Sequence, residues 1–256
     1  MKIKKFLFIS LLLGTLTSSC VSKSKIVYLN GMNESKTSVI KTDVKLQSDD
    51  ILLIVVTSEN PEITIPYNLK QIIIMGDNVA QGGQQQRQLT YLIDKKGEIN
   101  FPIVGNISVA GLTRIEAQNK IQSILREHIA DARVDIRIQN FKITVLGEVM
   151  RPGTINVSSE RITILEALGM VGDLGIQGKR DNILLIREQN GQSITQRLDL
   201  RDPNLIQSPY YYLAQNDVIY VEPNKTKINS SGVGPNLTVG LTALSLLIGI
   251  ISLTIK

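Results

Sequence analysis

The chain has 256 residues and a mass of 28.3 kDa, enough for one large domain or two small domains with separate cores. Apolar residues make up 43% and charged residues 20%, which excludes a wholly disordered or collagen-like chain. One cysteine and one histidine exclude an internal disulfide and a Cys/His zinc site, and no cofactor is expected. Residues 1–19 hold three of the 28 basic residues and no acid, so the remainder carries 25 basic against 23 acidic residues. This near-neutral balance argues against a nucleic-acid partner.

The N-terminus has the pattern of a secretory signal peptide over residues 1–19. Residues 1–5 are cationic, and residues 6–16 are apolar but too short to span a bilayer. Small residues precede Cys20 and resemble the bacterial lipobox, in which the cysteine receives lipid and becomes the mature N-terminus. The lipobox prefers Leu where this chain has Thr17, and the alternative is an ordinary signal peptide with a chance cysteine. Residues 20–41 are expected to form the lipidated N-terminus and a linker. By resemblance to lipoprotein sorting signals, the lack of Asp after Cys20 favours the outer membrane over retention in the inner membrane.

The C-terminus contains a long apolar segment. After a linker at residues 224–236, residues 237–255 would form a helix of about 28 Å, roughly the thickness of the hydrocarbon core, so a transmembrane helix is expected. One face of that helix would be small and weakly polar, suited to close helix packing or to lining a hydrated pore. A simple anchor is the alternative. The stripe consists of Thr238, Thr242, Ser245, Gly249 and Ser252.

The middle of the chain begins with a module of class α+β at residues 42–140. A buried strand is expected at residues 51–56, an irregular glycine-containing loop at residues 60–88, and a hairpin of residues 89–94 with 98–104. Thr113 and Glu116 form a capping-box pattern, which predicts an amphipathic helix. The apolar face of this helix includes Ala117, Ile121, Ile124, Leu125 and His128, and the single histidine is interpreted as structural.

A second α+β module is expected at residues 141–223. Thr163 and Glu166 form another capping box, which opens a short helix at Ile164–Met170. Asn190 and Gly191 predict the turn of a hairpin, and the last strand is expected at residues 217–221. Three glycines at positions 169, 172 and 175 are interpreted as helix-end and loop residues, not as a nucleotide-binding loop.

Catalytic and sugar-binding patterns are weak. A glycosidase needs two converging carboxylates, and Glu59 and Glu62 are candidates only because they are close in sequence, so no enzyme is expected. Sugar binders present aromatic faces, but the chain has no Trp. Consecutive Tyr210, Tyr211 and Tyr212 are the exception, and a strand would point them to both faces, as core and rim residues.

Several segments in order resemble bacterial polysaccharide export proteins of the Wza type. Residues 46–52, 91–102 and 109–113 are similar to the N-terminal export domain of that family, and residues 141–153 and 164–168 are similar to the SLBB module that follows it. The resemblance implies a β-grasp-like fold for the second module. It covers roughly residues 42–223, with room for only one SLBB module.

The resemblance also implies a function. It predicts a homo-oligomeric ring in the outer membrane that exports capsular or extracellular polysaccharide, with both modules in the periplasm. The implied partners are the polysaccharide and an inner-membrane co-polymerase or chain-length protein with tyrosine kinase activity. The alternative is a monomeric periplasmic or surface lipoprotein that binds glycans.

Overall fold

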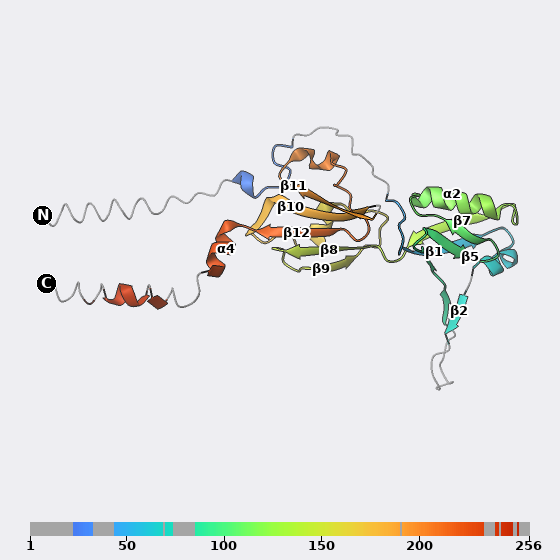
Figure 1. Ribbon diagram of the computed structural model, residues 1–256, viewed down its shortest axis with the longest axis horizontal. Helices are drawn as coiled ribbons and strands as arrows, with labels where there is room; N and C mark the ends of the chain where they lie inside the picture. Colours follow the sequence, from blue (N-terminus) through green and yellow to red (C-terminus); the bar gives the residue numbers. More distant parts are fainter. Residues whose placement is uncertain are drawn as a thin grey trace.

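The chain folds into two modules, each with a hydrophobic core of its own. The computed structural model describes residues 23–32, 44–68, 70–73, 85–189, 191–232, 239–240, 242–247 and 250. The two modules lie end to end along the long axis of the molecule (Figure 1). The first core runs in sequence from Leu46 to Ile136 and the second from Phe141 to Val221. The α+β class expected for both modules is confirmed.

The sheet of the first module is antiparallel with strand order β4-β1-β7. Its strands are β1 (Ile51–Thr57), β4 (Tyr91–Leu92) and β7 (Arg133–Ile138). Alternate side chains of β1 (Leu52, Ile54 and Val56) are buried, because successive side chains of a strand point to opposite faces. The predicted strand at residues 51–56 is therefore confirmed, and one face of the sheet is turned to the core.

Helix α2 (Arg114–Leu125) packs against β7. Its capping box is formed as expected: the Thr113 hydroxyl accepts from the Glu116 backbone N–H at 3.2 Å, and the Glu116 carboxylate accepts from the Thr113 N–H at 2.7 Å. Ala117, Ile121 and Leu125 are fully buried, since residues three and four apart share one helical face. The predicted helix is confirmed, and its apolar face is confirmed in part: Ile124 is half-buried against the core, whereas His128 lies beyond the end of the helix and is exposed.

The strand pairing around residues 89–108 differs from the expectation. The turn at Gly97 exists, with φ of 80° and its N–H donating to the Asp94 carbonyl at 2.9 Å. However, β4 pairs with β1, while β5 (Glu98–Phe101) pairs with β6 (Gly105–Ser108). The predicted hairpin of residues 89–94 with 98–104 is therefore right only at its turn, where Asp94 N–H donates to the Glu98 carbonyl at 2.9 Å. Its second strand ends at Phe101 because Ile103, at φ of 67°, reverses the chain.

The segment at residues 60–88 contains more regular structure than expected. It includes the 3₁₀ helix η2 (Pro61–Tyr67), followed by β2 (Lys70–Ile73) and β3 (Gln85–Gln88). β2 and β3 pair as an antiparallel ribbon that projects from the first module (Figure 1). The glycine-containing centre of the predicted loop lies outside the described residues.

The second module contains a mixed five-stranded sheet with order β11-β10-β12-β8-β9. Its parallel pair, β8 (Lys142–Gly147) with β12 (Val218–Pro223), lies beside antiparallel pairs. Helix α3 (Ile164–Met170) has the predicted bounds and the predicted capping box of Thr163 with Glu166. The 3₁₀ helix η3 (Pro203–Gln207) precedes the last strand. The other strands are β9 (Gly153–Asn156), β10 (Gly178–Gln189) and β11 (Gln192–Leu198).

The predicted hairpin of the second module is confirmed. Pairing of β10 with β11 continues to Gln189 opposite Gln192, so only two residues connect the strands. Gly191 has φ of 72°, the left-handed conformation that such turns need, and Asn190 lies outside the described residues.

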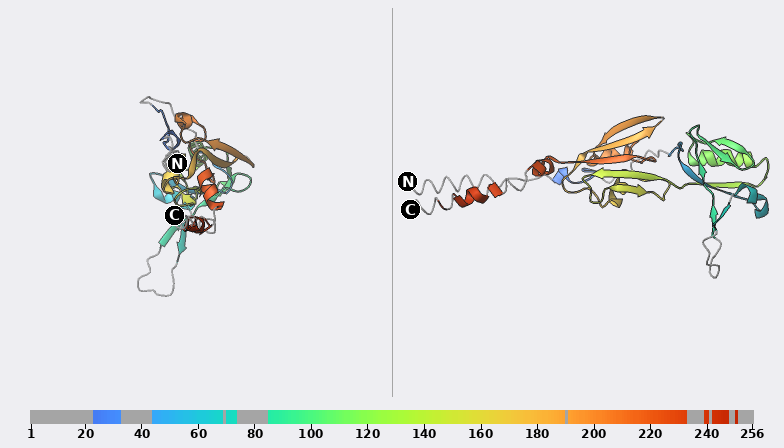
Figure 2. Two further views of the ribbon diagram at one scale, coloured as in Figure 1. Left: turned by 90° about the vertical axis from the view of Figure 1, so that its left-hand side faces the viewer. Right: turned by 60° about the horizontal axis from the view of Figure 1, so that its bottom comes forward.

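The N-terminal segment of residues 23–32 and helix α4 (Lys225–Gly232) lie at the end of the second module that is opposite the first module, here called the far end (Figures 1 and 2). The N-terminal segment contains the 3₁₀ helix η1 (Lys23–Lys25), and Leu29 N–H donates to the Leu200 carbonyl at 2.9 Å. Helix α4 follows β12 directly, and Asn224 N–H donates to the Gln177 carbonyl at 2.7 Å. The far end thus comprises residues 23–32, 147–153, 170–178 and 223–232.

The expectation of a C-terminal transmembrane helix at residues 237–255 is wrong. Of the helices in the described part of the chain, none has the length and apolar composition needed to cross a bilayer. Helix α4 has eight residues and two lysines, whereas a span needs about 20 apolar residues. That prediction rested on the apolar composition and the lack of charge of residues 237–255, and composition alone does not determine the length of a helix.

Several predicted positions lie outside the described residues. These include the signal peptide and Cys20 at the N-terminus, and Thr238, Gly249 and Ser252 of the stripe. The other two stripe residues are exposed and helical, and each hydroxyl donates to a carbonyl three residues earlier: Thr242 to Val239 at 3.1 Å and Ser245 to Thr242 at 2.8 Å. The packing role of the stripe stays a prediction.

Candidate functional site

The junction between the modules is held by the side chains of Asn140 and Gln215. The Asn140 amide accepts from Ile51 N–H at 2.8 Å and donates to the Asp49 carbonyl at 2.9 Å, both in the first module. Gln215, from the second module, donates to the Asn140 carbonyl at 2.7 Å and accepts from Lys142 N–H at 2.8 Å. The connection between β7 and β8 is therefore fixed from both sides by amide side chains.

Asp50 is a buried carboxylate at this junction. Only 1% of the residue is exposed, and burial raises the pKa of Asp50 to about 6. Hydrogen bonds from the Gln47 N–H and from Gln215 oppose this shift by stabilising the charged form, and the nearby charge of Asp49 adds to it. The junction therefore contains an acid that can gain a proton in mildly acidic surroundings.

A cleft of about 910 Å³ opens beside this junction and is lined by residues of both modules. Arg114 at the start of α2 bridges to Glu160 of the second module at 3.0 Å, and Arg137 bonds Asp135 at 3.2 Å. Each of these two acids of the cleft is thus paired with an arginine. The cleft offers polar contacts but lacks a pair of converging free carboxylates for hydrolysis.

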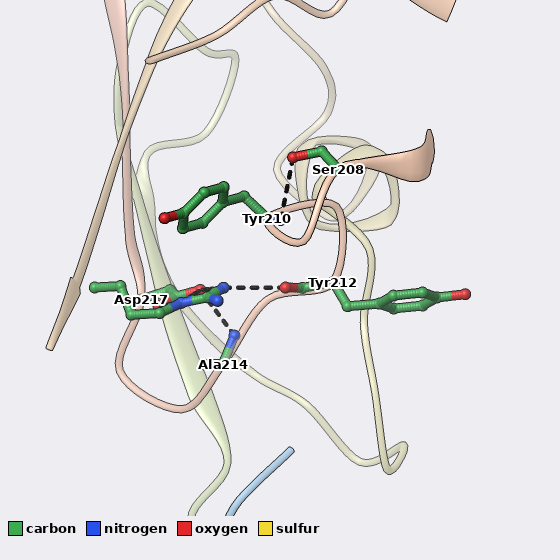
Figure 3. Close-up of polar contacts among 6 residues, drawn as sticks. Ser208, Tyr210, Tyr212, Ala214 and Asp217 are labelled. Atoms are coloured by element: carbon green, nitrogen blue, oxygen red, sulfur yellow. Dashed lines mark hydrogen bonds and ion pairs between the residues drawn. The ribbon is translucent and has the colours of Figure 1, made fainter. Parts of the chain in front are cut away.

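A buried ion pair between Arg187 of β10 and Asp217 fixes the loop before β12 (Figure 3). The guanidinium contacts both carboxylate oxygens, at 2.9 Å from Nε and 2.7 Å from Nη2, and it also donates to the Tyr212 carbonyl at 3.0 Å. Ala214 N–H donates to Asp217 at 2.7 Å. Burial raises the pKa of Asp217, whereas the Arg187 charge and hydrogen bonds lower it. Because both side chains are engaged in these hydrogen bonds, we interpret the ion pair as structural and not catalytic.

The three consecutive tyrosines lie between η3 and β12 and not in a strand, so the strand expected for them is wrong. Tyr210 and Tyr211 pack against the second core, in agreement with a core and rim role. The guanidinium of Arg187 lies 5.5 Å from the Tyr210 ring centre, and that of Arg161 lies 5.3 Å from the Tyr212 ring centre. These contacts within the chain explain why the three tyrosines are present, and no bound sugar is needed to explain them.

The far end joins the N-terminal segment to the loop after α3. The Tyr28 hydroxyl donates to the Asp173 carboxylate, and the Arg180 guanidinium lies 5.7 Å from the Tyr28 ring centre. Burial is the largest cause of the raised pKa of Tyr28, and the bond to Asp173 adds to it. The segment that follows Cys20 is therefore tied to the second module.

The residues considered for catalysis are not brought together. His128 lies near Tyr67, with 6.5 Å between ring centres, and Glu62 is in the first turn of η2. The N–H of Glu59 donates to Asp131 at 2.6 Å. Within the described ranges, no cluster of three His, Cys, Asp or Glu residues could hold a metal ion. The glycines at 169, 172 and 175 form the end of α3 and the loop after it.

Sequence reasoning missed the residues that hold these sites together. Asn140 and Gln215 are 75 positions apart, and Arg187 and Asp217 are 30 apart, so no local pattern joins them. Strict alternation at Arg133–Ile138, however, was a usable signal for β7.

Each of the two modules matches a known family model. Residues 39–139 match the family described as polysaccharide biosynthesis/export protein, and residues 141–221 match the SLBB domain. The chain is similar to two proteins named "EPS I polysaccharide export outer membrane protein EpsA". One, from Ralstonia solanacearum, is 27% identical over 187 residues, covering 72% of this chain and 49% of that protein. The other, from Ralstonia nicotianae, is 30% identical over 150 residues, covering 57% of this chain and 39% of that protein.

The two modules and their order define an export domain followed by one SLBB domain. Together with the similarity to the two EpsA proteins, these two domains support a polysaccharide export protein of the Wza type. It matches about half or less of the length of these two curated relatives.

Proposed function

We propose that this protein is a subunit of an oligomeric outer-membrane channel that exports capsular or extracellular polysaccharide from the periplasm to the cell surface. The observation that carries the proposal is the export module followed by the SLBB module, with the N-terminal and C-terminal segments both at the far end. Lipid on Cys20 attaches the far end to the outer membrane, and the export module extends into the periplasm.

In this arrangement each chain forms part of the channel wall and performs no catalysis. A transport path needs polar surfaces that a long glycan contacts weakly and leaves again. The paired charges of the cleft, Arg114 with Glu160 and Arg137 with Asp135, offer such contacts. Several copies surround the path, and the small side chains of the stripe that includes Thr242 and Ser245 allow close packing between neighbouring copies.

The export module lies farthest from the lipid and is the part that meets an inner-membrane co-polymerase. The ribbon of β2 and β3 projects from this module and is available for such a contact (Figure 2). Asn140 bonds to both modules, so it holds the export module in a defined orientation relative to the far end.

Deletion of the gene in its host tests the proposal. We expect polysaccharide at the cell surface to fall and polymer to accumulate in the periplasm, with recovery on expression of the full chain. Normal surface polysaccharide after deletion would contradict the export role. If the deletion strain exports polysaccharide normally but sheds it from the cells, the protein retains glycan at the surface. The alternative of a glycan-binding lipoprotein would then describe it better.

A further inference from the structure

The far end exposes four large apolar side chains. Met150 is 67% exposed, Met170 53%, Ile176 70% and Ile228 52%. These four residues are called the apolar rim. They come from the turn after β8, the end of α3, the loop before β10, and α4.

Backbone contacts hold these segments of the rim together. Met150 N–H donates to the Asp173 carbonyl at 3.1 Å, and Gly175 N–H donates to the Glu148 carbonyl at 3.1 Å. Lys227 of α4 lies 3.8 Å from the Glu148 carboxylate. The rim is therefore one surface made of loops that converge at the far end.

Basic residues surround the apolar rim. The residues at 23–28, 147–151, 170–178 and 224–232 include five basic side chains and two acidic ones, Glu148 and Asp173. Each acid already has a partner, Lys227 for Glu148 and Tyr28 for Asp173. A surface with apolar side chains flanked by lysines is suited to insertion into the headgroup region of an anionic bilayer. The basic residues are Lys23, Lys25, Arg151, Lys225 and Lys227.

The chain itself limits the distance between the rim and the lipid. Cys20 precedes Lys23 by three residues, which span at most about 11 Å. Because Tyr28 is bonded to Asp173, a lipid on Cys20 holds the far end close to the membrane surface. This step rests on the proposed lipid attachment.

We propose that the apolar rim inserts into the headgroup region of the periplasmic leaflet, so that the far end lies on the lipid surface. The rim gives the protein a second membrane contact besides the lipid, and it fixes the tilt of the two modules. A single acyl anchor permits tilting, whereas additional apolar contacts from several segments of the far end restrict it. A lipid surface fits these residues better than a second copy, because the segments beside them contribute five basic side chains and the two acidic side chains among them are already paired.

Tryptophan fluorescence tests the contact, since the chain contains no Trp. Full-length acylated Met150→Trp is reconstituted into vesicles of phosphatidylethanolamine and phosphatidylglycerol, with and without bromine on the acyl chains. Ile176→Trp repeats the measurement on another loop of the rim. Ile65→Trp is the matched control, because Ile65 is 66% exposed and lies in η2 of the first module.

We expect bromine to reduce the emission of Met150→Trp and Ile176→Trp by roughly half or more, and to leave Ile65→Trp almost unchanged, because an interfacial side chain sits near the acyl chains. Equal emission with and without bromine at both rim positions, in protein that floats with the vesicles, would overturn the rim contact and leave the lipid attachment standing. A blue-shifted emission insensitive to bromine would instead assign the rim to a contact between copies. Protein that does not float contradicts the attachment and the rim together.

Discussion

Asn140 and Gln215 join the two modules through a hydrogen bond of 2.7 Å from the Gln215 amide to the Asn140 carbonyl. The side chain of Asn140 simultaneously bonds the backbone of Ile51 and Asp49. One residue of the connecting segment therefore contacts both modules, and the orientation of the export module depends on it.

Loss of the Asn140 side chain should loosen this junction. Asn140→Ala removes two hydrogen bonds and leaves the Ile51 N–H without its partner, which costs about 1–3 kcal/mol. Urea unfolding of the full chain measures the change. Asn106→Ala is the control, because Asn106 is exposed on β6. The free energy of unfolding of this variant should stay within about 0.5 kcal/mol of that of the parent. Equal stability of the two variants would contradict a structural role for Asn140.

The stability of the first module should depend on pH through Asp50. Its pKa is raised to about 6 in the folded protein, so the folded state binds more protons than the unfolded state between pH 4 and 6. Stability from this group is therefore present below pH 4 and lost as the pH rises through 6. The loss is roughly 3 kcal/mol, since one pKa unit corresponds to about 1.4 kcal/mol.

Asp50→Asn isolates this effect because the amide does not ionise and its oxygen still accepts from Gln47 N–H. We expect the variant to become more stable than the parent as the pH rises from 4 to 8, measured by urea unfolding at several pH values. Asp135→Asn, at an exposed ion pair, should keep the pH profile of the parent. An unchanged profile in Asp50→Asn would show that another group titrates.

The buried pair of Arg187 and Asp217 should be far more sensitive than an exposed pair. Asp217→Ala leaves a guanidinium that is 11% exposed without its carboxylate, at a cost of about 3–5 kcal/mol. Asp135→Ala breaks the exposed pair with Arg137 and should cost less than about 1 kcal/mol. Thermal unfolding measures the melting temperatures of both variants. Similar melting temperatures would contradict the greater structural importance of the buried Arg187–Asp217 pair.

Gly147 should not accept a side chain. Its φ is 90°, and a Cβ there would lie 2.1 Å from the Val221 carbonyl oxygen of the parallel strand β12. Gly147→Ala should therefore destabilise the second module by more than about 2 kcal/mol. Gly153→Ala is the matched control because nothing lies within 4 Å of its Cβ position. Urea unfolding that ranks the two variants equally would contradict the close approach of β8 and β12.

Local patterns of the sequence predicted much of the fold. The capping boxes at Thr113 and Thr163 and the turn at Gly191 depend on neighbouring residues, and all three are formed. Pairing of β5 with β6 was missed because it depends on the conformation of Ile103, which the sequence does not reveal.

The candidate site was less predictable. The junction of Asn140 with Gln215 and the bond of Tyr28 to Asp173 join residues 75 and 145 positions apart. Such contacts appear only once the sheet order brings the segments together. The transmembrane helix was predicted from apolar composition alone, and the helices of the described residues are too short for it.

The native mass of the full-length acylated protein, extracted from outer membranes, tests the proposed channel most directly. A Cys20→Ala version, which cannot receive lipid, is measured beside it. We predict a closed oligomer in the outer-membrane fraction for the parent, and loss of that fraction for the variant. A parent protein that is monomeric after extraction, or that is absent from the outer membrane, would contradict a channel subunit.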